Sequence, residues 1–244
     1  MVFKNVYEDD IYSDAYSKLE FPNDYYLAYR DLPEIFSEHV TKTSGKAIDF
    51  GCGTGRSTRF LKKHGFDATG VDISKDMLDK ARVIDPNGSY QLIKNSDFSN
   101  LEKDSYDLII SIFTFDNIPG VDNRANIMKG LKNLLNAEGT MILLDSTPEL
   151  YVNEWASFST KDFPQNKLAK SGDKVYDIIT DVEDRRPCVD ILWTDDDYKI
   201  CFNTAKLNLV TTHNPLGKAE EPYNWINETK IAPWVIYVLK KTKH

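Results

Sequence analysis

Between residues 46 and 145, short apolar runs alternate with segments whose apolar residues recur every three to four positions. The apolar runs predict β-strands at 47–50, 67–72, 90–94, 106–113 and 139–145. The helical spacing predicts helices at 56–64, from 75 to about 83, and at 122–136. This alternation is typical of a parallel sheet with helices on both faces.

Turn and cap residues divide these segments in a consistent way. Gly65 is placed to end the first helix, and Ser74 to cap the start of the second. Pro86-Asn-Gly88 predicts a turn before the third strand. Thr194, followed by the acids at 195–197, predicts the start of a late helix, because negative charge is favourable at a helix N-terminus. We interpret that acidic run as a helix cap rather than a metal site, and we expect no metal.

The regular alternation stops after residue 146 and resumes only near the C-terminus. A stretch this long between core elements is usually an inserted subdomain or a functional segment. Strands at 207–212 and 233–239 then bring the sheet to seven. The predicted fold is α/β: a doubly wound, mostly parallel, seven-stranded sheet with a cap inserted between the fifth strand and the last helix. The expected divisions are an N-terminal helical lid (1–44), the core (45–146), the cap (147–193), and the last helix with two strands (194–244).

Composition and charge narrow the classes of partner. The 244 residues are 41% hydrophobic and 28% charged, which is ordinary for a globular protein with a sizeable core. The net charge of −8, without a basic patch, argues against a nucleic-acid substrate. Three widely spaced cysteines, no signal-peptide pattern and no apolar run of about 20 residues predict a cytoplasmic protein that does not span a membrane.

The most informative motif is the glycine-rich stretch that follows the first strand. Asp49-x-Gly51-x-Gly53-x-Gly55 leads directly into a predicted helix. Glycines let the backbone turn sharply and let a ligand approach, and the N–H groups at the helix start face that ligand. Dinucleotide enzymes place a third glycine where this chain has Arg56, which weakens the hypothesis of a nicotinamide-dependent dehydrogenase. Asp72, at the end of the second strand, is placed to accept hydrogen bonds from ribose hydroxyls. Together, the glycine-rich stretch and Asp72 favour a nucleoside ligand.

Four motifs in order resemble those of the class I S-adenosylmethionine (SAM)-dependent methyltransferases. Ile48-Asp-Phe-Gly-Cys-Gly-Thr-Gly55 is similar to the first motif of that family, and Thr69-Gly-Val-Asp-Ile-Ser74 to the second. Ser96-Asp97-Phe98 matches the position of its adenine-binding acid. Tyr106-Asp-Leu-Ile-Ile-Ser-Ile-Phe113 resembles its fourth-strand motif. The resemblance covers roughly residues 45–145 and implies SAM as cofactor and S-adenosylhomocysteine as product.

By this resemblance, Gly51 and Gly53 flank the methionine part of SAM, and Asp49 holds either the loop or the amino group. Asp72 binds the ribose and Ile73 packs on the adenine. The remaining implied cofactor contacts are Asp97 at the adenine amino group, Phe98 beside it, Met77 and Phe113. Core packing is the alternative role for Met77.

Two residues of the N-terminal segment are further cofactor candidates. Arg30 could pair with the methionine carboxylate, and its alternative is a surface ion pair. Tyr16 matches a position where N-terminal helices of the family touch the cofactor, and its alternative is helix packing.

The segment after the fourth strand is where this family meets its substrate. Asp116 is a candidate base or amine-binding group, with a loop anchor as its alternative. Asn117 offers an amide, and Phe115 an aromatic wall. In the cap, Trp155 and Phe158 could supply area for an apolar or cationic acceptor. A satellite core or a dimer surface is the other interpretation of the cap.

The expected activity is methyl transfer from SAM to an N, O or C atom of a small molecule by a monomer or homodimer. A peptide or natural-product precursor as the acceptor is one alternative. A non-catalytic SAM-binding module is the other, because an intact pocket does not establish turnover.

Overall fold

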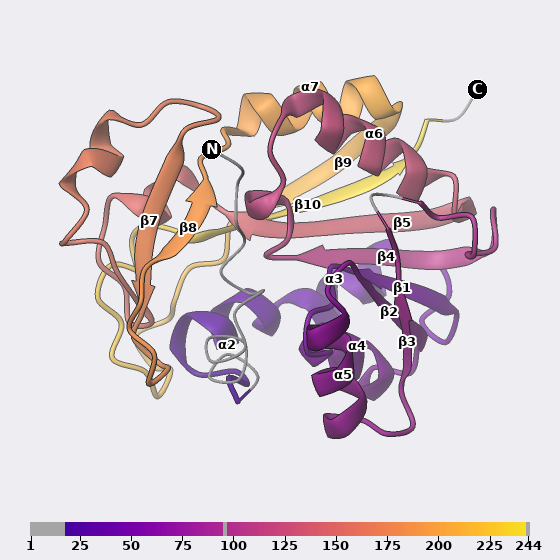
Figure 1. Cartoon of the computed structure of the whole chain (residues 1–244), viewed down its shortest axis with the longest axis horizontal. Coiled ribbons are helices and arrows are strands. Elements are labelled where there is room, and N and C mark those ends of the chain that lie inside the picture. Colours follow the sequence, from indigo (N-terminus) through magenta and orange to yellow (C-terminus); the bar gives the residue numbers. More distant parts are fainter. Residues whose placement is uncertain (1–17, 95–96, 243–244) are drawn as a thin grey trace.

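The computed structural model describes residues 18–94 and 97–242 of the chain (Figure 1). Seven strands form one sheet in the order β3-β2-β1-β4-β5-β10-β9, in which β10 runs antiparallel to both neighbours. These strands are β1 (Lys46–Phe50), β2 (Asp67–Asp72), β3 (Ser89–Leu92), β4 (Tyr106–Ile112), β5 (Leu135–Ser146), β9 (Leu207–His213) and β10 (Trp234–Lys241). The predicted seven-stranded, mostly parallel sheet is confirmed.

Helices cover both faces of this sheet. Figure 1 shows α6 and α7 on one face and α3, α4 and α5 on the other. The helices are α2 (Asn23–Arg30), α3 (Leu32–His39), α4 (Arg56–Lys63), α5 (Lys75–Ile84), α6 (Val121–Lys132) and α7 (Asp195–Ala205). Successive residues of β1 point to opposite core layers: Ala47 packs with the α3 side and Ile48 with the α6 side. Both faces are buried, which explains why the central strands are continuous apolar runs.

The boundary between α6 and β5 differs from the prediction. The apolar pair Leu134 and Leu135 continues the helical spacing, so the sequence predicts a helix to residue 136. In the structure α6 ends at Lys132, and Leu135 already pairs with Tyr106 of β4. Both leucines are buried by the sheet, so burial alone could not separate a last helical turn from a strand.

Two predicted helix caps are confirmed. The Ser74 hydroxyl accepts a hydrogen bond from the Met77 N–H, 3.3 Å away, at the start of α5. At the start of α7, Thr194 Oγ1 accepts from the Asp197 N–H, and the Asp197 carboxylate accepts from the Thr194 N–H. These reciprocal bonds satisfy two backbone donors that the helix itself leaves unpaired.

We expect Thr194→Ala to lower the free energy of unfolding by about 1 kcal/mol, because it removes one side of this capping box. Thr204→Ala is the matched control, since Thr204 is an exposed threonine near the end of the same helix. Alanine favours helix there, so the control should not destabilise the protein. Equal losses in urea denaturation for the two variants would contradict the capping role.

The inserted segment forms a second, smaller sheet. Strands β6 (Phe158–Ser159), β7 (Lys174–Ile179) and β8 (Cys188–Ile191) pair antiparallel in that order. Figure 1 shows β7 and β8 at one end of the main sheet, with α2 nearby. Short 3₁₀ turns lie at Phe115–Asn117 (η2), Pro148–Tyr151 (η3) and Pro164–Leu168 (η4). The strand β8 contacts η2, so the small sheet packs on the loop that follows β4.

Helix α2 is fastened to this small sheet and to β10. The buried Asp24 carboxylate accepts a hydrogen bond from the Ser157 N–H at 2.7 Å, and Ser157 Oγ lies 3.1 Å from the Asp24 N–H that donates to it. The Trp234 indole N–H donates to the Asp24 carbonyl. The described part of the predicted N-terminal lid is therefore packed into the core.

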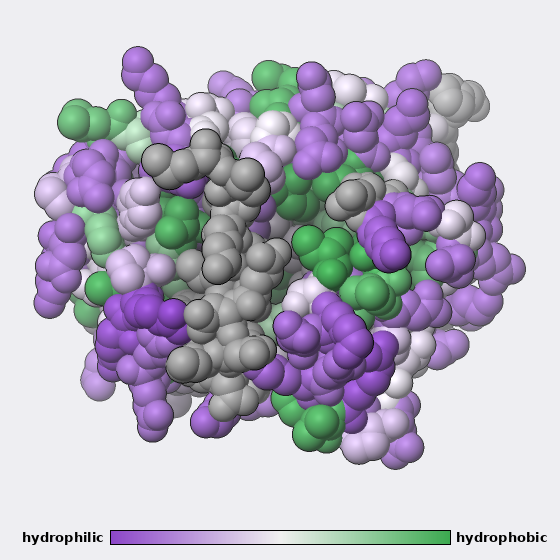
Figure 2. Space-filling model, viewed as in Figure 1, coloured by the Kyte–Doolittle hydropathy of each residue, from purple (hydrophilic) through white to green (hydrophobic). Residues whose placement is uncertain are grey.

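The surface of the face drawn in Figure 2 is mostly hydrophilic, with hydrophobic side chains in scattered groups. No helix in residues 18–94 and 97–242 has the length and apolar character that a membrane span needs.

Candidate functional site

The glycine loop between β1 and α4 has the backbone that its sequence predicts. Gly51, Gly53 and Gly55 have φ angles of +74°, +52° and +80°, which side-chain-bearing residues rarely adopt. A β-carbon at position 51 would lie 2.2 Å from Oγ1 of Thr114, and one at position 55 would lie 2.4 Å from the Tyr90 hydroxyl oxygen. Neighbouring side chains thus fill the space at those two positions. At Gly53 the nearest atom would be the Met77 methyl at 3.3 Å, a tight contact with the end of a flexible side chain.

The buried Asp49 side chain links the two ends of this loop by hydrogen bonds. One carboxylate oxygen accepts hydrogen bonds from the Ser57 and Thr58 hydroxyls, both at 2.6 Å, and so ties the end of β1 to the first turn of α4. Burial raises the pKa of Asp49 to about 6. Of the two roles expected for Asp49, holding the loop is the one with contacts in the structure.

Asp72 lies at the end of β2, beside the loop. Its carboxylate accepts hydrogen bonds from the Gly53 and Ser74 N–H groups, both at 2.8 Å. A carboxylate oxygen has more than one lone pair, so each oxygen can still accept from a ligand hydroxyl. The next side chain, Ile73, is 62% exposed, which is unusual for isoleucine next to a core strand. A fixed carboxylate beside an exposed apolar side chain fits a nucleoside.

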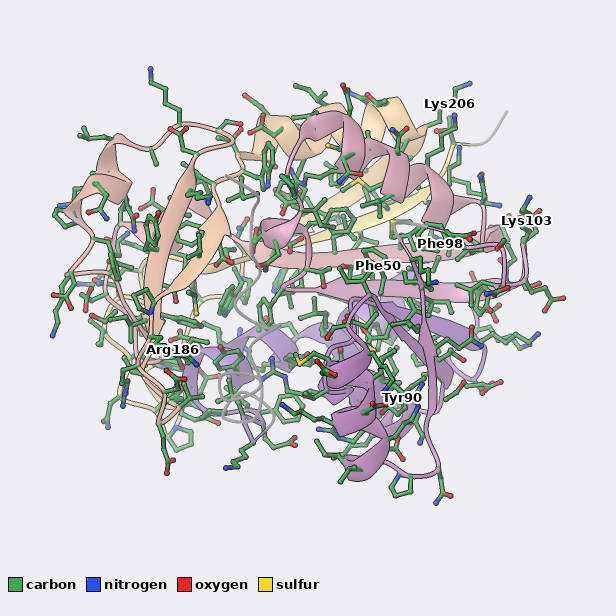
Figure 3. The ribbon with its side chains drawn as sticks, in the orientation of Figure 1. Phe50, Tyr90, Phe98, Lys103, Arg186 and Lys206 are labelled. Atoms are coloured by element: carbon green, nitrogen blue, oxygen red, sulfur yellow. The ribbon has the colours of Figure 1, made fainter. Side chains whose placement is uncertain are left out.

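Asp97 and Phe98 follow β3, at the same edge of the sheet. Asp97 is exposed, and its carboxylate accepts a hydrogen bond from the Ser99 N–H at 2.9 Å. Figure 3 labels Phe98 and Phe50, whose ring centroids are 6.0 Å apart. A β-carbon on Gly130 of α6 would lie 2.5 Å from the Phe98 ring, so this ring packs closely on that helix. This packing fixes Phe98 at the sheet edge, and its contact with the adenine stays a prediction.

The backbone turns abruptly where β4 ends. Phe113 has a φ of +56°, a strained value for a non-glycine residue that is often found at functional sites. Its ring lies 5.8 Å from that of Tyr25 and 4.7 Å from that of Trp234. The Thr114 hydroxyl, one residue later, lies 3.4 Å from the Gly51 carbonyl oxygen. The turn therefore touches the glycine loop on one side and aromatic rings on the other.

A cavity of about 30 Å³ lies between this turn and the small sheet, with room for about two water-sized groups. The main sheet and its loops contribute Phe113, Asp116, Asn117, Ser146 and Trp234 to its lining. Helix α2 contributes Tyr25. The inserted segment contributes Leu150, Phe158, Asp177, Ile179, Cys188 and Asp190. Three of the twelve lining residues are carboxylic acids, in a wall that is otherwise largely apolar.

Asp116 both anchors its loop and lines this cavity. It is 4% exposed and accepts hydrogen bonds from the Ser146 N–H at 3.0 Å and the Tyr198 hydroxyl at 3.4 Å. Burial raises its pKa, against the opposing effects of those hydrogen bonds and of the Arg124 charge. The loop anchor left open by the sequence is therefore present, and a catalytic or binding role stays a prediction.

Several predicted site residues have other environments. Phe115 is fully buried, with its ring 5.9 Å from Phe50, so it belongs to the core and forms no substrate wall. Trp155 is 2% exposed, and its indole N–H donates to the Leu150 carbonyl, so it too is a core residue. Arg30 forms ion pairs with Asp31 and Glu221, which is the alternative that the sequence left open. Tyr16 lies outside the described residues.

Sequence reasoning missed most of the cavity. Asp177 and Asp190 come from the inserted segment, where the sequence analysis singled out only aromatic residues. The alternation of apolar and polar residues in 174–179 was a signal for a strand there, and it could have flagged Asp177 on the apolar face. Arg124 of α6 was missed as well. It is fully buried, with its guanidinium 4.3 Å from the Trp193 ring and 4.2 Å from the Tyr198 ring.

Comparison with known families settles the class of the protein. A family model described as a methyltransferase domain matches residues 23–179, which is more than half of the chain. This chain belongs to that methyltransferase family. The match includes the glycine loop, the β4 turn and strands β6 and β7 of the small sheet.

Individual relatives agree with that family. The chain is 22% identical over 182 residues to an uncharacterized methyltransferase of Alkaliphilus oremlandii, covering 74% of this chain and 82% of that protein. It is 26% identical over 112 residues to a ubiquinone biosynthesis O-methyltransferase of Methylococcus capsulatus. That match covers 44% of this methyltransferase and less than half, 46%, of the relative.

The fold is shared with solved methyltransferases. An S-adenosylmethionine-dependent methyltransferase from Clostridium acetobutylicum superposes with a TM-score of 0.64 at 17% identity, over 98% of this chain and 97% of that one. The predicted family, enzyme class and Rossmann-like fold are thereby confirmed.

Proposed function

We propose that this methyltransferase transfers the methyl group of SAM to a small-molecule acceptor held in the cavity between the β4 turn and the small sheet. SAM is the cofactor and S-adenosylhomocysteine the product. The observation that carries the proposal is the cavity itself, since its walls come from the main sheet, α2 and the inserted segment. Under this proposal the inserted segment acts as the acceptor cap.

The edge of the main sheet fits SAM. The turn of the glycine loop at Gly53 can receive the methionine part, and the Asp72 carboxylate can take the ribose hydroxyls. The exposed Ile73 can pack against the adenine, with Asp97 placed for its amino group. SAM supplies a methyl carbon that is already activated by its bond to a sulfonium sulfur.

The chain has to align the acceptor and exclude water. Thr114 touches the glycine loop, while Phe113 and Asn117 line the acceptor cavity, so one turn positions both partners. Alignment of two reactants in one site lowers the barrier by several kcal/mol without a further catalytic group. The apolar and aromatic cavity walls keep bulk water from the reacting atoms.

The cavity of about 30 Å³ admits a small head group, and a small molecule can present such a group there. The net charge of −8 disfavours nucleic acid for the same site. The match to a ubiquinone biosynthesis enzyme also supports a small acceptor. The oligomeric state, monomer or homodimer, stays a prediction.

Turnover is tested by incubating the protein and SAM with a small-metabolite extract and measuring release of S-adenosylhomocysteine. We expect release with the extract fraction below about 1 kDa and none with the protein fraction. Release only with proteins or peptides would contradict the proposed acceptor class. Tight SAM binding without release from any fraction would instead favour a non-catalytic SAM-binding module.

We expect Asp72→Ala to weaken SAM binding by about 1–3 kcal/mol, because it removes charge-assisted hydrogen bonds to the ribose. Titration calorimetry measures the dissociation constant directly. Asp76→Ala is the matched control, because Asp76 is an exposed aspartate in the first turn of α5. Unchanged SAM affinity in Asp72→Ala would show that this carboxylate does not hold the ribose.

A further inference from the structure

Three carboxylic acids from separate elements converge on the cavity. Asp177 of β7 is 2% exposed, Asp116 of η2 is 4% exposed, and Asp190 of β8 is partly buried. Asp177 and Asp190 are contributed by neighbouring strands of the cap, and Asp116 by the turn after β4. The carboxylates therefore face the acceptor from two sides.

Asp177 stands out because its carboxylate is incompletely satisfied. Its Oδ2 atom is buried and has no hydrogen-bond partner among residues 18–94 and 97–242. Asp190, by contrast, accepts a hydrogen bond from the Tyr151 hydroxyl at 3.2 Å. Buried polar atoms are nearly always hydrogen-bonded, so an orphan acceptor that lines a cavity indicates a missing donor.

The carboxylates of Asp177 and Asp190 also lack a nearby cation among the described residues. Burial raises the pKa of Asp116 and of its neighbour Asp145, and the Arg124 charge partly opposes that rise. Among residues 18–94 and 97–242, no cation opposes the rise in pKa of Asp177 or Asp190. Burial and the charge of Asp116 raise the pKa of both, and Asp177 also raises that of Asp190. Burying carboxylates together is costly unless a cation joins them.

The rest of the wall is aromatic. Tyr25, Phe113, Phe158 and Trp234 line the cavity, and their rings lie in contact with one another at centroid distances of 4.7 to 5.8 Å. Aromatic faces attract desolvated cations, and they do so best where water is excluded. The Arg56 guanidinium already lies 4.6 Å from the Tyr25 ring centroid, so the acids together with Phe158 and Trp234 form the lining expected around a ligand's ammonium group.

We propose that this methyltransferase recognises its acceptor through a protonated amine, which Asp177 and Asp190 bind by accepting its N–H hydrogen bonds. The aromatic walls enclose the cation, and the remainder of the acceptor lies outside this small cavity. The inference rests on the proposed function, because it names the chemistry of the acceptor at the same site. It does not require the amine nitrogen to be the atom that is methylated.

The test uses paired probes that differ only in the charged group. Phenethylammonium and 2-phenylethanol are titrated at pH 8 into the protein, with and without saturating S-adenosylhomocysteine, and binding is followed by ligand-observed NMR. We expect the ammonium to bind at least tenfold more tightly than the alcohol. Equal binding of the two, or no binding of the ammonium, would overturn the proposal.

Asparagine variants of the cavity aspartates test whether the ammonium binds in this cavity. Asp177→Asn and Asp190→Asn should each weaken ammonium binding at least tenfold and leave the affinity for SAM within twofold. Asp162→Asn is the matched control, because Asp162 is an exposed aspartate of the same segment outside the cavity. Ammonium binding that survives both cavity variants would overturn the assignment. Failure of the proposed function is distinguishable, since the unmodified protein would then fail to bind SAM or would release no S-adenosylhomocysteine with the small-metabolite fraction.

Discussion

Asp177→Asn is expected to make the protein more stable at pH 8, by roughly 2–4 kcal/mol, while it weakens acceptor binding. Burial and the nearby Asp116 charge raise the pKa of Asp177 from 3.8 to about 7. At pH 8 the wild-type carboxyl is ionised in a buried site without a cation, and an asparagine there carries no charge. Gain of stability with loss of function is typical of residues kept for binding.

The gain should depend on pH in one direction. Between about pH 4 and 7 the folded protein binds a proton at Asp177 that the unfolded chain lacks, so the free energy of unfolding falls as the pH rises. The difference in the free energy of unfolding between wild type and Asp177→Asn should therefore be small near pH 3.5 and greatest above pH 7. The groups that face Asp177, namely Asp116, Asp190, Tyr151 and Cys188, are unchanged by the substitution.

Urea denaturation at pH 4, 6 and 8 measures this dependence, with Asp162→Asn as the control that should match wild type throughout. A variant that is less stable than wild type at pH 8 would contradict the account. It would mean that Asp177 makes a stabilising contact in the ligand-free protein.

Gly51→Ala is expected to lower the free energy of unfolding by about 2–4 kcal/mol and to abolish measurable SAM binding. The φ angle of +74° is strained for alanine, and the new β-carbon would lie 2.2 Å from Oγ1 of Thr114. Relief of that overlap requires the glycine loop and the β4 turn to separate, which displaces the proposed cofactor and acceptor sites.

Gly172→Ala isolates the contribution of the overlap. Gly172 has a similar φ of +86°, but a β-carbon there would meet nothing within 4 Å. The free energy of unfolding of this variant should fall only by the cost of a left-handed backbone conformation for alanine, about 1 kcal/mol. The variant should bind SAM normally. Thermal or urea unfolding of both variants gives the comparison. Similar losses in both would mean that Thr114 does not constrain the loop.

The sequence predicts the fold and the backbone of the glycine loop well, because both depend on local signals. Apolar runs, glycines and cap residues such as Ser74 and Thr194 act within a few positions of the chain, so they can be recognised without the structure. The boundary at Leu134 and Leu135 is the exception, since buried leucines fit a helix and a strand equally.

The cavity beside the β4 turn could not be predicted in the same way, because it depends on contacts between distant segments. Asp177 and Asp116 are brought together only when the small sheet packs on the β4 turn. Aromatic residues of the cap looked equivalent in the sequence, yet Phe158 lines the cavity while Trp155 is a core residue. The ion pair of Arg30 with Glu221 likewise joins segments about 190 residues apart.

We predict that the loop from Asp49 to Gly55, together with Asp72, forms the SAM site of this methyltransferase. Titration calorimetry with SAM, S-adenosylhomocysteine and NAD tests it most directly. We predict binding of SAM and S-adenosylhomocysteine with micromolar dissociation constants, loss of that binding in Gly51→Ala, and no binding of NAD. A protein that bound NAD and ignored both SAM and S-adenosylhomocysteine would contradict the account.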